Sequence, residues 1–357
     1  MRRACLTVAA LLLLGSASAA IADEDLHVVI PSFIIHAEDQ HEFTAKAGAE
    51  ANLQIWTWTP RAVFFLAEDL PSGGVLEAEY LSAKGKPWIT VPCRDGGSNG
   101  IVCGGQSEDI AHEKYSRETG SFAFKIHYKN ELTGVADKVI FAGTFKVDKY
   151  YDGRTAADYK KEDKDCFEYF VDYDWAMPLG YLSFIADNGA PALQVWMWFK
   201  FGPEEPNENN FNAHVFYQGK EVCASLGFHS EPEAYEQIDT DNAAGRYGWS
   251  KHLFMIPLCQ VKLENPELNP RAFQVDKNPG EYEVKVLWNG KLARVGKFTV
   301  NADGTIANPL GDKNPQLHTS RRVMPVQILG DQDYKFDKTA WKTGMNFGNP
   351  VTDFVAP

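Results

Sequence analysis

The sequence predicts an all-β chain of two tandem antiparallel β-sandwiches, and two observations predict this fold class. Many short runs of β-branched and aromatic residues are separated by Gly and Pro, with almost no helical periodicity. Three segments also repeat in the same order: residues 53–58 (LQIWTW) with 193–198 (LQVWMW), 120–128 with 280–288, and 143–147 with 296–300. Self-similarity of this kind indicates a module that was duplicated within the chain.

The length of 357 residues fits two domains of roughly 100 to 150 residues each, because single cores seldom grow larger. The pattern of short strands favours an immunoglobulin-like topology, although the Cys-Trp-Cys spacing of antibody domains is missing. We expect a signal peptide at 1–22, a first module at 23–148, a charged linker at 149–164, a second module at 165–305, and an extended C-terminal docking tail at 306–357.

The N-terminus has the three-part composition of a secretory signal. Arg2 and Arg3 precede an apolar run at residues 4–14, and small residues follow up to a cleavage point before Ala20 or Asp23. The run is shorter than the roughly 20 apolar residues of a transmembrane helix. We therefore expect an exported protein, located in the periplasm, on the outer surface or outside the cell, that meets the membrane only through the cleaved signal.

The formal net charge of −13 argues against partners that are themselves strongly negative. Nucleic acid and anionic lipid surfaces would on average be repelled. A hydrophobic content of 44% is sufficient for packed cores and excludes general disorder.

Five cysteines remain after signal cleavage, and an oxidising compartment favours their pairing. Cys93 and Cys103 flank a Gly-rich turn, which predicts a local disulfide. Cys223 and Cys259 would then pair in the second module and leave Cys166 over. Pairing of Cys166 with another of these cysteines, or with a second chain, stays open.

In the first module, residues 26–30 and 32–36 are predicted as the opening strands, and residues 53–58 as a central strand with large apolar side chains on both faces. The strands that follow are expected at residues 75–80, 88–91, 122–128 and 139–147. The run at 122–128 alternates strictly, which places every second side chain in the core.

The second module is predicted to begin with a strand at 165–171, followed by strands at 181–185, 193–198 and 213–217. Its middle section, residues 231–279, is longer than the matching part of the first module. Insertions in sandwiches lie in loops, where binding specificity usually resides.

The tail contains one predicted strand, residues 322–329. Pro325 within it argues for an edge position, because proline cannot donate a ladder hydrogen bond. The tail either packs on its own chain or adds a strand to the sheet of a partner.

Motifs for chemistry are few. Residues 96–100 match the G-x-S-x-G pattern, but a nucleophile elbow needs a strand followed by a helix, and none is predicted here. The acidic pairs Asp172/Asp174 and Asp239/Asp241 are weak candidates for calcium, without the spacing of an EF-hand loop. Histidine, cysteine and methionine spacings support neither a copper nor a zinc site. We therefore predict no cofactor and no catalytic residue.

The aromatic residues are more informative. The repeated tryptophans, Trp56, Trp58, Trp196 and Trp198, are interpreted mainly as core residues, with a repeated ligand platform as the alternative. Trp88, Trp249 and Trp341 have no repeated counterpart and are the candidates for exposed binding contacts.

These observations favour a non-enzymatic exported protein of a bacterial envelope or cell surface, which binds a protein partner or a surface glycan through loops, strand edges and exposed aromatics. A glycan-binding module protein is the alternative from another class. A hydrolase with a site built from loops is a third possibility. The oligomeric state stays open.

Overall fold

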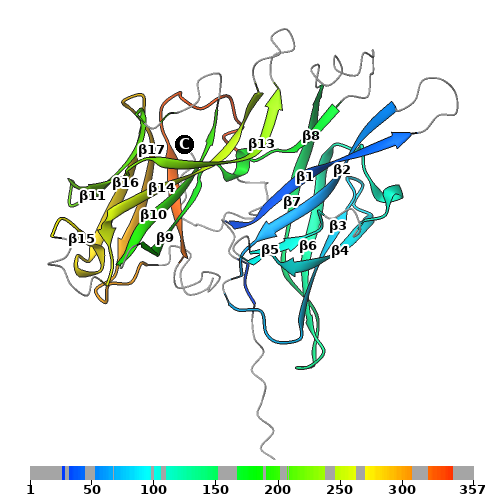
Figure 1. Ribbon diagram of the computed structural model, residues 1–357, viewed down its shortest axis with the longest axis horizontal. Helices are drawn as coiled ribbons and strands as arrows, with labels where there is room; N and C mark the ends of the chain where they lie inside the picture. The colour runs from blue at the N-terminus through cyan, green and yellow to red at the C-terminus, as the bar shows by residue number, and fades with distance from the viewer. Residues whose placement is uncertain are drawn as a thin grey trace, which may run out of the picture.

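The computed structural model describes residues 26–28, 32–44, 53–66, 68–97, 100–105, 110–151, 167–187, 190–201, 207, 209–237, 246–262, 270–307 and 321–340. Within these ranges the chain forms β-strands and short 3₁₀ helices, and no α-helix. The strands assemble into two sheets that lie side by side along the long axis of the molecule (Figure 1). The predicted all-β class is confirmed.

The first sheet has the order β1-β2-β5-β4-β3-β6-β7-β8. Its strands are β1 (Ile34–Thr44), β2 (Leu53–Phe64), β3 (Gly74–Leu81), β4 (Pro87–Asp95), β5 (Ile101–Cys103), β6 (Gly120–Asn130), β7 (Val135–Tyr151) and β8 (Phe167–Val171). The sheet curves back on itself, so that its two end strands, β1 and β8, contact each other without pairing.

The second sheet has the order β12-β11-β16-β17-β18-β9-β10-β14-β13, with β15 paired to β14. Its strands are β9 (Leu179–Asp187), β10 (Ala190–Lys200), β11 (Phe211–Tyr217), β12 (Lys220–Ala224), β13 (Phe228–Gln237), β14 (Arg246–Gln260), β15 (Phe273–Gln274), β16 (Gly280–Trp288), β17 (Lys291–Val300) and β18 (Arg321–Ile328). Contact between β12 and β14 brings this sheet close to closure as well.

Most strands have corresponding neighbours in the two sheets once β13 and β15 are set aside. Taken in chain order, β1 to β8 correspond to β9, β10, β11, β12, β14, β16, β17 and β18. Two seams differ. In the second sheet the last strand, β18, pairs with the first strand, β9, whereas β8 and β1 of the first sheet do not pair. In the first sheet β4 pairs with β5, whereas the corresponding strands β12 and β14 are joined without a ladder.

The hairpins β6–β7 and β16–β17 also share their register. The matched pairs are Gly120↔Val147 with Gly280↔Val300, Phe122↔Phe145 with Tyr282↔Phe298, and Phe124↔Gly143 with Val284↔Gly296. Both opening glycines have positive φ, 117° for Gly120 and 137° for Gly280. The strict alternation predicted for residues 122–128 is confirmed by alternate burial along β6.

The tryptophan-bearing strands, β2 and β10, are both central but bury opposite faces. Trp58 lies inside the first core, in edge-on contact with Phe122. In β10 the residues that enter the second core are Leu193, Val195 and Met197, and Trp198 on the other face packs against the first core. A shift of one residue exchanges the two faces of a strand. The repeated letters therefore do not mark equivalent side-chain environments.

Two strands lie elsewhere than the predicted module boundaries imply. Residues 165–171 were expected to open the second module, whereas β8 pairs with β7 in the first sheet. The strand predicted within the tail, β18, docks on its own chain, between β17 and β9. Residues 1–22, 152–166 and 341–357 lie outside the described residues, as does Cys166.

Pro325 does not mark an edge strand, and this expectation was wrong. Residues 321–325 of β18 pair with β9, and residues 326–328 pair with β17. Pro325 is the point at which the strand passes from one neighbour to the other, so its missing N–H removes little from the ladder. The following N–H, of Val326, donates to the carbonyl oxygen of Pro178 at 3.0 Å.

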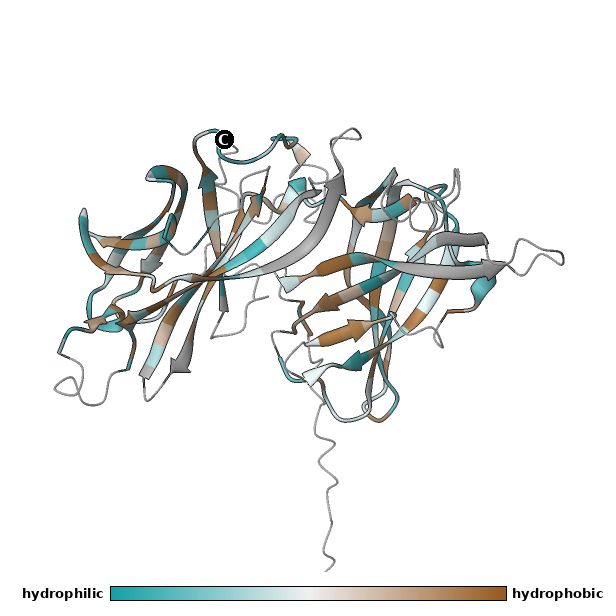
Figure 2. Cartoon of the chain, turned by 45° about the horizontal axis from the view of Figure 1, so that its top comes forward, coloured by the Kyte–Doolittle hydropathy of each residue, from teal (hydrophilic) through white to brown (hydrophobic). Residues whose placement is uncertain are grey.

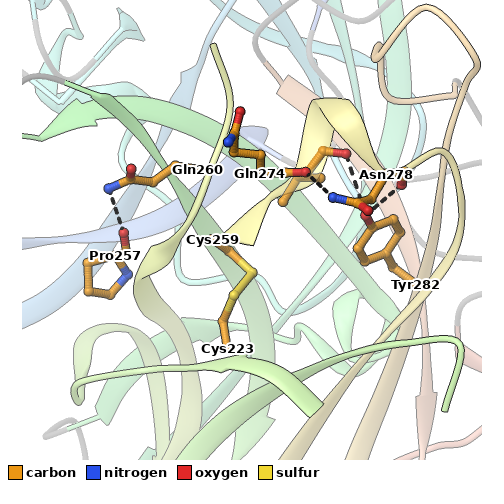
Figure 3. Close-up of a disulfide and its surroundings, with 8 residues drawn as sticks. Cys223, Pro257, Cys259, Gln260, Gln274, Asn278 and Tyr282 are labelled. Carbon is orange, nitrogen blue, oxygen red and sulfur yellow. Dashed lines mark hydrogen bonds between the residues drawn. A yellow bond between two sulfur atoms is a disulfide. The ribbon is translucent and has the colours of Figure 1, made fainter. Parts of the chain in front are cut away.

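Both predicted disulfides are present. Cys93 and Cys103 occupy directly paired positions on β4 and β5. Cys223 and Cys259 join β12 to β14, and beside them Asn278 donates to the carbonyl of Gln274 at 2.7 Å (Figure 3).

Apolar segments alternate with polar ones along the strands of both sheets (Figure 2), as expected for sheets with one buried face.

Candidate functional site

The two sheets are joined by residues 172–178, and all but one of these residues are buried. At the centre lies the 3₁₀ helix η4 (Asp174–Ala176), whose three residues are all buried. Connecting segments usually run over the surface, because buried backbone groups must find partners inside the protein. This segment is thus part of the core and not a flexible tether.

Asp174 is the polar centre of this joint. Its Oδ1 accepts hydrogen bonds from Trp249 Nε1 at 2.9 Å and from Lys200 Nζ at 3.2 Å. Its Oδ2 accepts the backbone N–H of Asp337 at 2.8 Å. Burial raises the pKa of the Asp174 carboxyl, the nearby Asp172 carboxylate adds to the rise, and Lys200 opposes it. A buried ion pair of this kind fixes geometry more than it adds stability.

Aromatic rings surround the ion pair. Lys200 Nζ lies 4.2 Å from the centroid of the Trp249 ring. Trp198 stacks on Tyr173 with ring centroids 5.2 Å apart, and the Tyr173 hydroxyl donates to the backbone oxygen of Ile35. Residues from both sheets and from the connecting segment therefore form one buried cluster, which we call the joint cluster.

The chain after β18 braces the same region. Asp333 receives two hydrogen bonds from Arg294, at 2.5 and 2.6 Å, and one from the backbone N–H of Lys200 at 3.1 Å. The Arg294 side chain is 0% exposed, and Phe336 packs against the first core. Residues 329–340 therefore link the second sheet to the first.

The three candidate tryptophans occupy unlike places. Trp88 is half-buried, donates from Nε1 to the carbonyl oxygen of Lys114 at 2.8 Å, and packs edge-on against Trp58. Trp249 is 1% exposed, so the expectation that it lies on the surface was wrong. Its indole N–H donates a hydrogen bond to the buried carboxylate of Asp174, so Trp249 belongs to the joint cluster. Trp341 lies outside the described residues.

The weak metal candidates find little support. Asp239 and Asp241 lie outside the described residues. In the acidic pair that is described, the oxygens of Asp174 face protein donors, and Asp172 pairs with Lys146 at 3.4 Å. Across the described ranges, no three His, Cys, Asp or Glu side chains gather in a way that could hold a metal ion.

The G-x-S-x-G pattern falls at the tip of the β4–β5 hairpin. The N–H of Gly96 donates to the carbonyl oxygen of Gly100 at 2.6 Å, which closes a tight turn between two strands. A nucleophile elbow instead lies between a strand and a helix. The turn accounts for the glycines of this motif.

Two adjoining surface clefts lie on the outer face of the second sheet. One, of about 450 Å³, is lined by Phe216, Tyr217, Gln218, Gly219, Gly280, Glu281 and Glu283. The other, of about 260 Å³, includes Lys297, Thr299, Val323 and Pro325 and shares the two glutamates. Glu283 accepts hydrogen bonds from Lys285 and Lys297, which lower the pKa of its carboxyl. Glu281 lines both clefts. Aromatic, amide and carboxylate groups thus meet on one exposed face.

Sequence reasoning named Asp174 and Trp249 in other roles, and it missed Lys200 and the neighbouring Arg294. Lys200 and Arg294 lie in strands at positions where a charged residue is ordinarily taken as solvent-exposed. One available signal was the aromatic run around Asp174, residues 173–175, which is unusually apolar for a segment between domains.

No protein-family model, no curated protein and no solved structure matches this chain. Among the described residues, no helix reaches the length and apolar character that a membrane span requires.

Proposed function

We propose that this chain is an exported, non-enzymatic binding or structural protein of a bacterial envelope or cell surface, in which two similar sandwich modules act as one rigid body. The observation that carries this proposal is the joint cluster. Interfaces between domains are usually polar and permit movement, whereas this one buries aromatic rings and an ion pair. A fixed spacing between two modules suits a protein that holds partners in place.

Export is supported by two independent features. The N-terminal residues have the charge and apolar pattern of a cleaved signal. The chain also contains two disulfides, and disulfides form and persist mainly in oxidising compartments outside the cytoplasm.

Each module is proposed to be an immunoglobulin-like sandwich that arose by internal duplication. Immunoglobulin domains place strands ABED in one sheet and CFG in the other. The order β1-β2-β5-β4 followed by β3-β6-β7 has this arrangement if the strands are lettered along the chain. The shared register of β6–β7 and β16–β17 supports duplication. The opposite faces buried by β2 and β10 indicate that the copies have since diverged.

A glycan-binding role is the second candidate, and the clefts on the outer face of the second sheet favour it. Phe216 and Tyr217 offer aromatic surface, and Gln218 and Glu281 offer hydrogen-bonding groups beside it. Sugar-binding surfaces combine these two kinds of side chain, because sugar rings have both apolar faces and hydroxyl edges.

Fractionation of bacteria that express the full chain tests export. We expect the protein outside the cytoplasm, beginning at Ala20 or Asp23, with both disulfides formed. Retention in the cytoplasm with an intact N-terminus and reduced cysteines would contradict the proposal.

Co-sedimentation of the purified mature protein with isolated envelopes tests binding. Loss of sedimentation after protease treatment of the envelopes supports a protein partner. Loss after periodate oxidation supports the glycan alternative, which Glu281→Gln should then weaken, with Glu221→Gln on β12 as the matched control. Absence of sedimentation under all conditions would contradict a binding role.

A further inference from the structure

His252 on β14 is buried in the second core without a polar partner. Its exposed fraction is 0%, and within the described part of the chain neither ring nitrogen has a hydrogen-bond partner. A buried polar group in this state costs roughly 1–3 kcal/mol.

Aromatic rings from several strands surround this imidazole. Phe201 after β10, Phe211 of β11 and Phe228 of β13 have ring centroids at 5.0, 5.1 and 5.2 Å from it. Phe199 and Phe254 complete the set at 5.5 and 6.5 Å. These rings offer no hydrogen-bond acceptor, so a protonated imidazole would lose its hydration here without a polar group to replace it.

The charged and titratable groups near His252 also disfavour its protonated form. They are Arg294 on β17 and His229 on β13. Arg294 is held by Asp333, so its position is fixed. The rings that face it from β10, from β11 and from Phe201 carry no charge.

The position of His252 connects the second core to the first sheet. His252 pairs with Ser230 of β13, and β13 contacts β7 and β8 of the first sheet. On the same strand, Trp249 binds Asp174 in the joint cluster. A change that loosens β13 and β14 would therefore reach the contact between the two halves.

We propose that His252 is an acid-sensitive latch, whose protonation opens the β13–β14 side of the second sheet and releases the contact of β13 with the first sheet. The proposal goes beyond a binding or structural role, because it makes the rigidity of the molecule depend on pH. The proton comes from solvent, and no other reactant is needed.

The direction of the pH effect follows from the burial of the ring. Burial, with Arg294 and His229 adding to it, lowers the pKa of His252 from 6.5 to about 3. The unfolded chain therefore binds a proton in a pH range in which the folded chain does not. The contribution of His252 to the free energy of unfolding is fully present above the unfolded pKa of 6.5, and it is lost as the pH falls from there toward 3. Asp174, whose pKa is raised, contributes in the opposite sense, so comparison with a His252 variant at each pH isolates the histidine.

The test is denaturant unfolding of the full mature protein at pH 7, 6, 5 and 4, together with hydrogen exchange at pH 7 and 5. We expect the ratio of the wild-type unfolding constant to that of His252→Phe to rise about tenfold for each pH unit from 6 to 4. Protection factors of β13 and β14 should fall at pH 5, whereas those of β6 should be retained. His252→Phe should remove most of this dependence, and His252→Leu serves if the phenyl variant does not fold.

The matched control is His214→Phe. His214 lies on the outer face of β11, partly exposed, with Glu221 at 3.0 Å. This variant should keep the pH dependence of the wild type. An unchanged slope in both His252 variants would overturn the proposal, as would protection of β13 and β14 that does not differ between pH 7 and pH 5.

Discussion

Gly180 and Gly296 lie where β18 crosses between the two halves of the second sheet. A Cβ atom at Gly180 would stand 2.7 Å from the backbone oxygen of Trp196 and 2.8 Å from Val326. A Cβ at Gly296 would meet the end of the Met324 side chain at 2.6 Å. Backbone cannot yield easily, whereas a thioether end can.

We therefore predict that Gly180→Ala lowers the free energy of unfolding by about 1–3 kcal/mol, and that Gly296→Ala lowers it less. Urea unfolding of the two variants beside the wild type measures the difference. A larger loss for Gly296→Ala would show that the Met324 side chain is held more tightly than its chemistry suggests.

At the scale of single residues, the sequence shows the alternation of side chains along a strand more readily than which of the two faces is buried. The alternation around Trp58 and Trp198 was evident, yet one tryptophan enters its own core and the other turns toward the neighbouring sheet. Both faces of these strands carry large apolar groups, so the pattern alone could not decide between them. Asp174 was named only as a weak calcium ligand and Lys200 was missed, because their burial depends on each other across the fold.

The closing of the second sheet is an element-scale feature that depends on a covalent bond. β4 and β5 are paired along a ladder as well as joined by Cys93–Cys103. β12 and β14 are joined by Cys223–Cys259, and the N–H of Leu226, just after β12, donates to the oxygen of Met255 on β14 at 3.3 Å.

We predict that replacing Cys223 and Cys259 by Ala destabilises the protein by roughly 1 kcal/mol more than replacing Cys93 and Cys103. The sequence separation is 36 in the first case and 10 in the second, and a longer loop loses more entropy on closure. Hydrogen exchange should show β12 opening in the first double variant, while β4 and β5 stay protected in the second. Equal protection of β12 with and without its disulfide would contradict this role.

Elements made by neighbouring segments were predictable, and the strands that close each sheet were not. The hairpin that contains Phe122 and Phe145 follows from local alternation and a turn. β8 is separated from its partner β7 by residues 152–166, and β18 pairs with the distant β9 as well as with β17. No local signal says which module a terminal strand will join. Pro325 illustrates the same limit, because a strand that changes partners tolerates proline without being an edge.

At the scale of the whole molecule, the joint cluster is a buried contact between the two sheets. Asp174 and Lys200 have side chains that are only 8% and 4% exposed, so loss of either partner leaves a buried charge. Loss of both removes the penalty along with the attraction, and such double replacements are often close to neutral. Asp172, two residues away, pairs with the more exposed Lys146 and provides a matched comparison.

We predict that Asp174→Ala destabilises the protein by about 3–5 kcal/mol and separates the unfolding of the two halves. Asp172→Ala should cost about 0–1 kcal/mol and leave one cooperative transition. Calorimetry distinguishes one transition from two, and small-angle scattering should report a larger radius of gyration for Asp174→Ala alone. Adding Lys200→Met to Asp174→Asn should restore most of the stability, because no charge then remains buried. If all of these variants unfold in one transition and keep the radius of gyration of the wild type, the two sheets are held together by their apolar surfaces. The ion pair then does not contribute to holding them together.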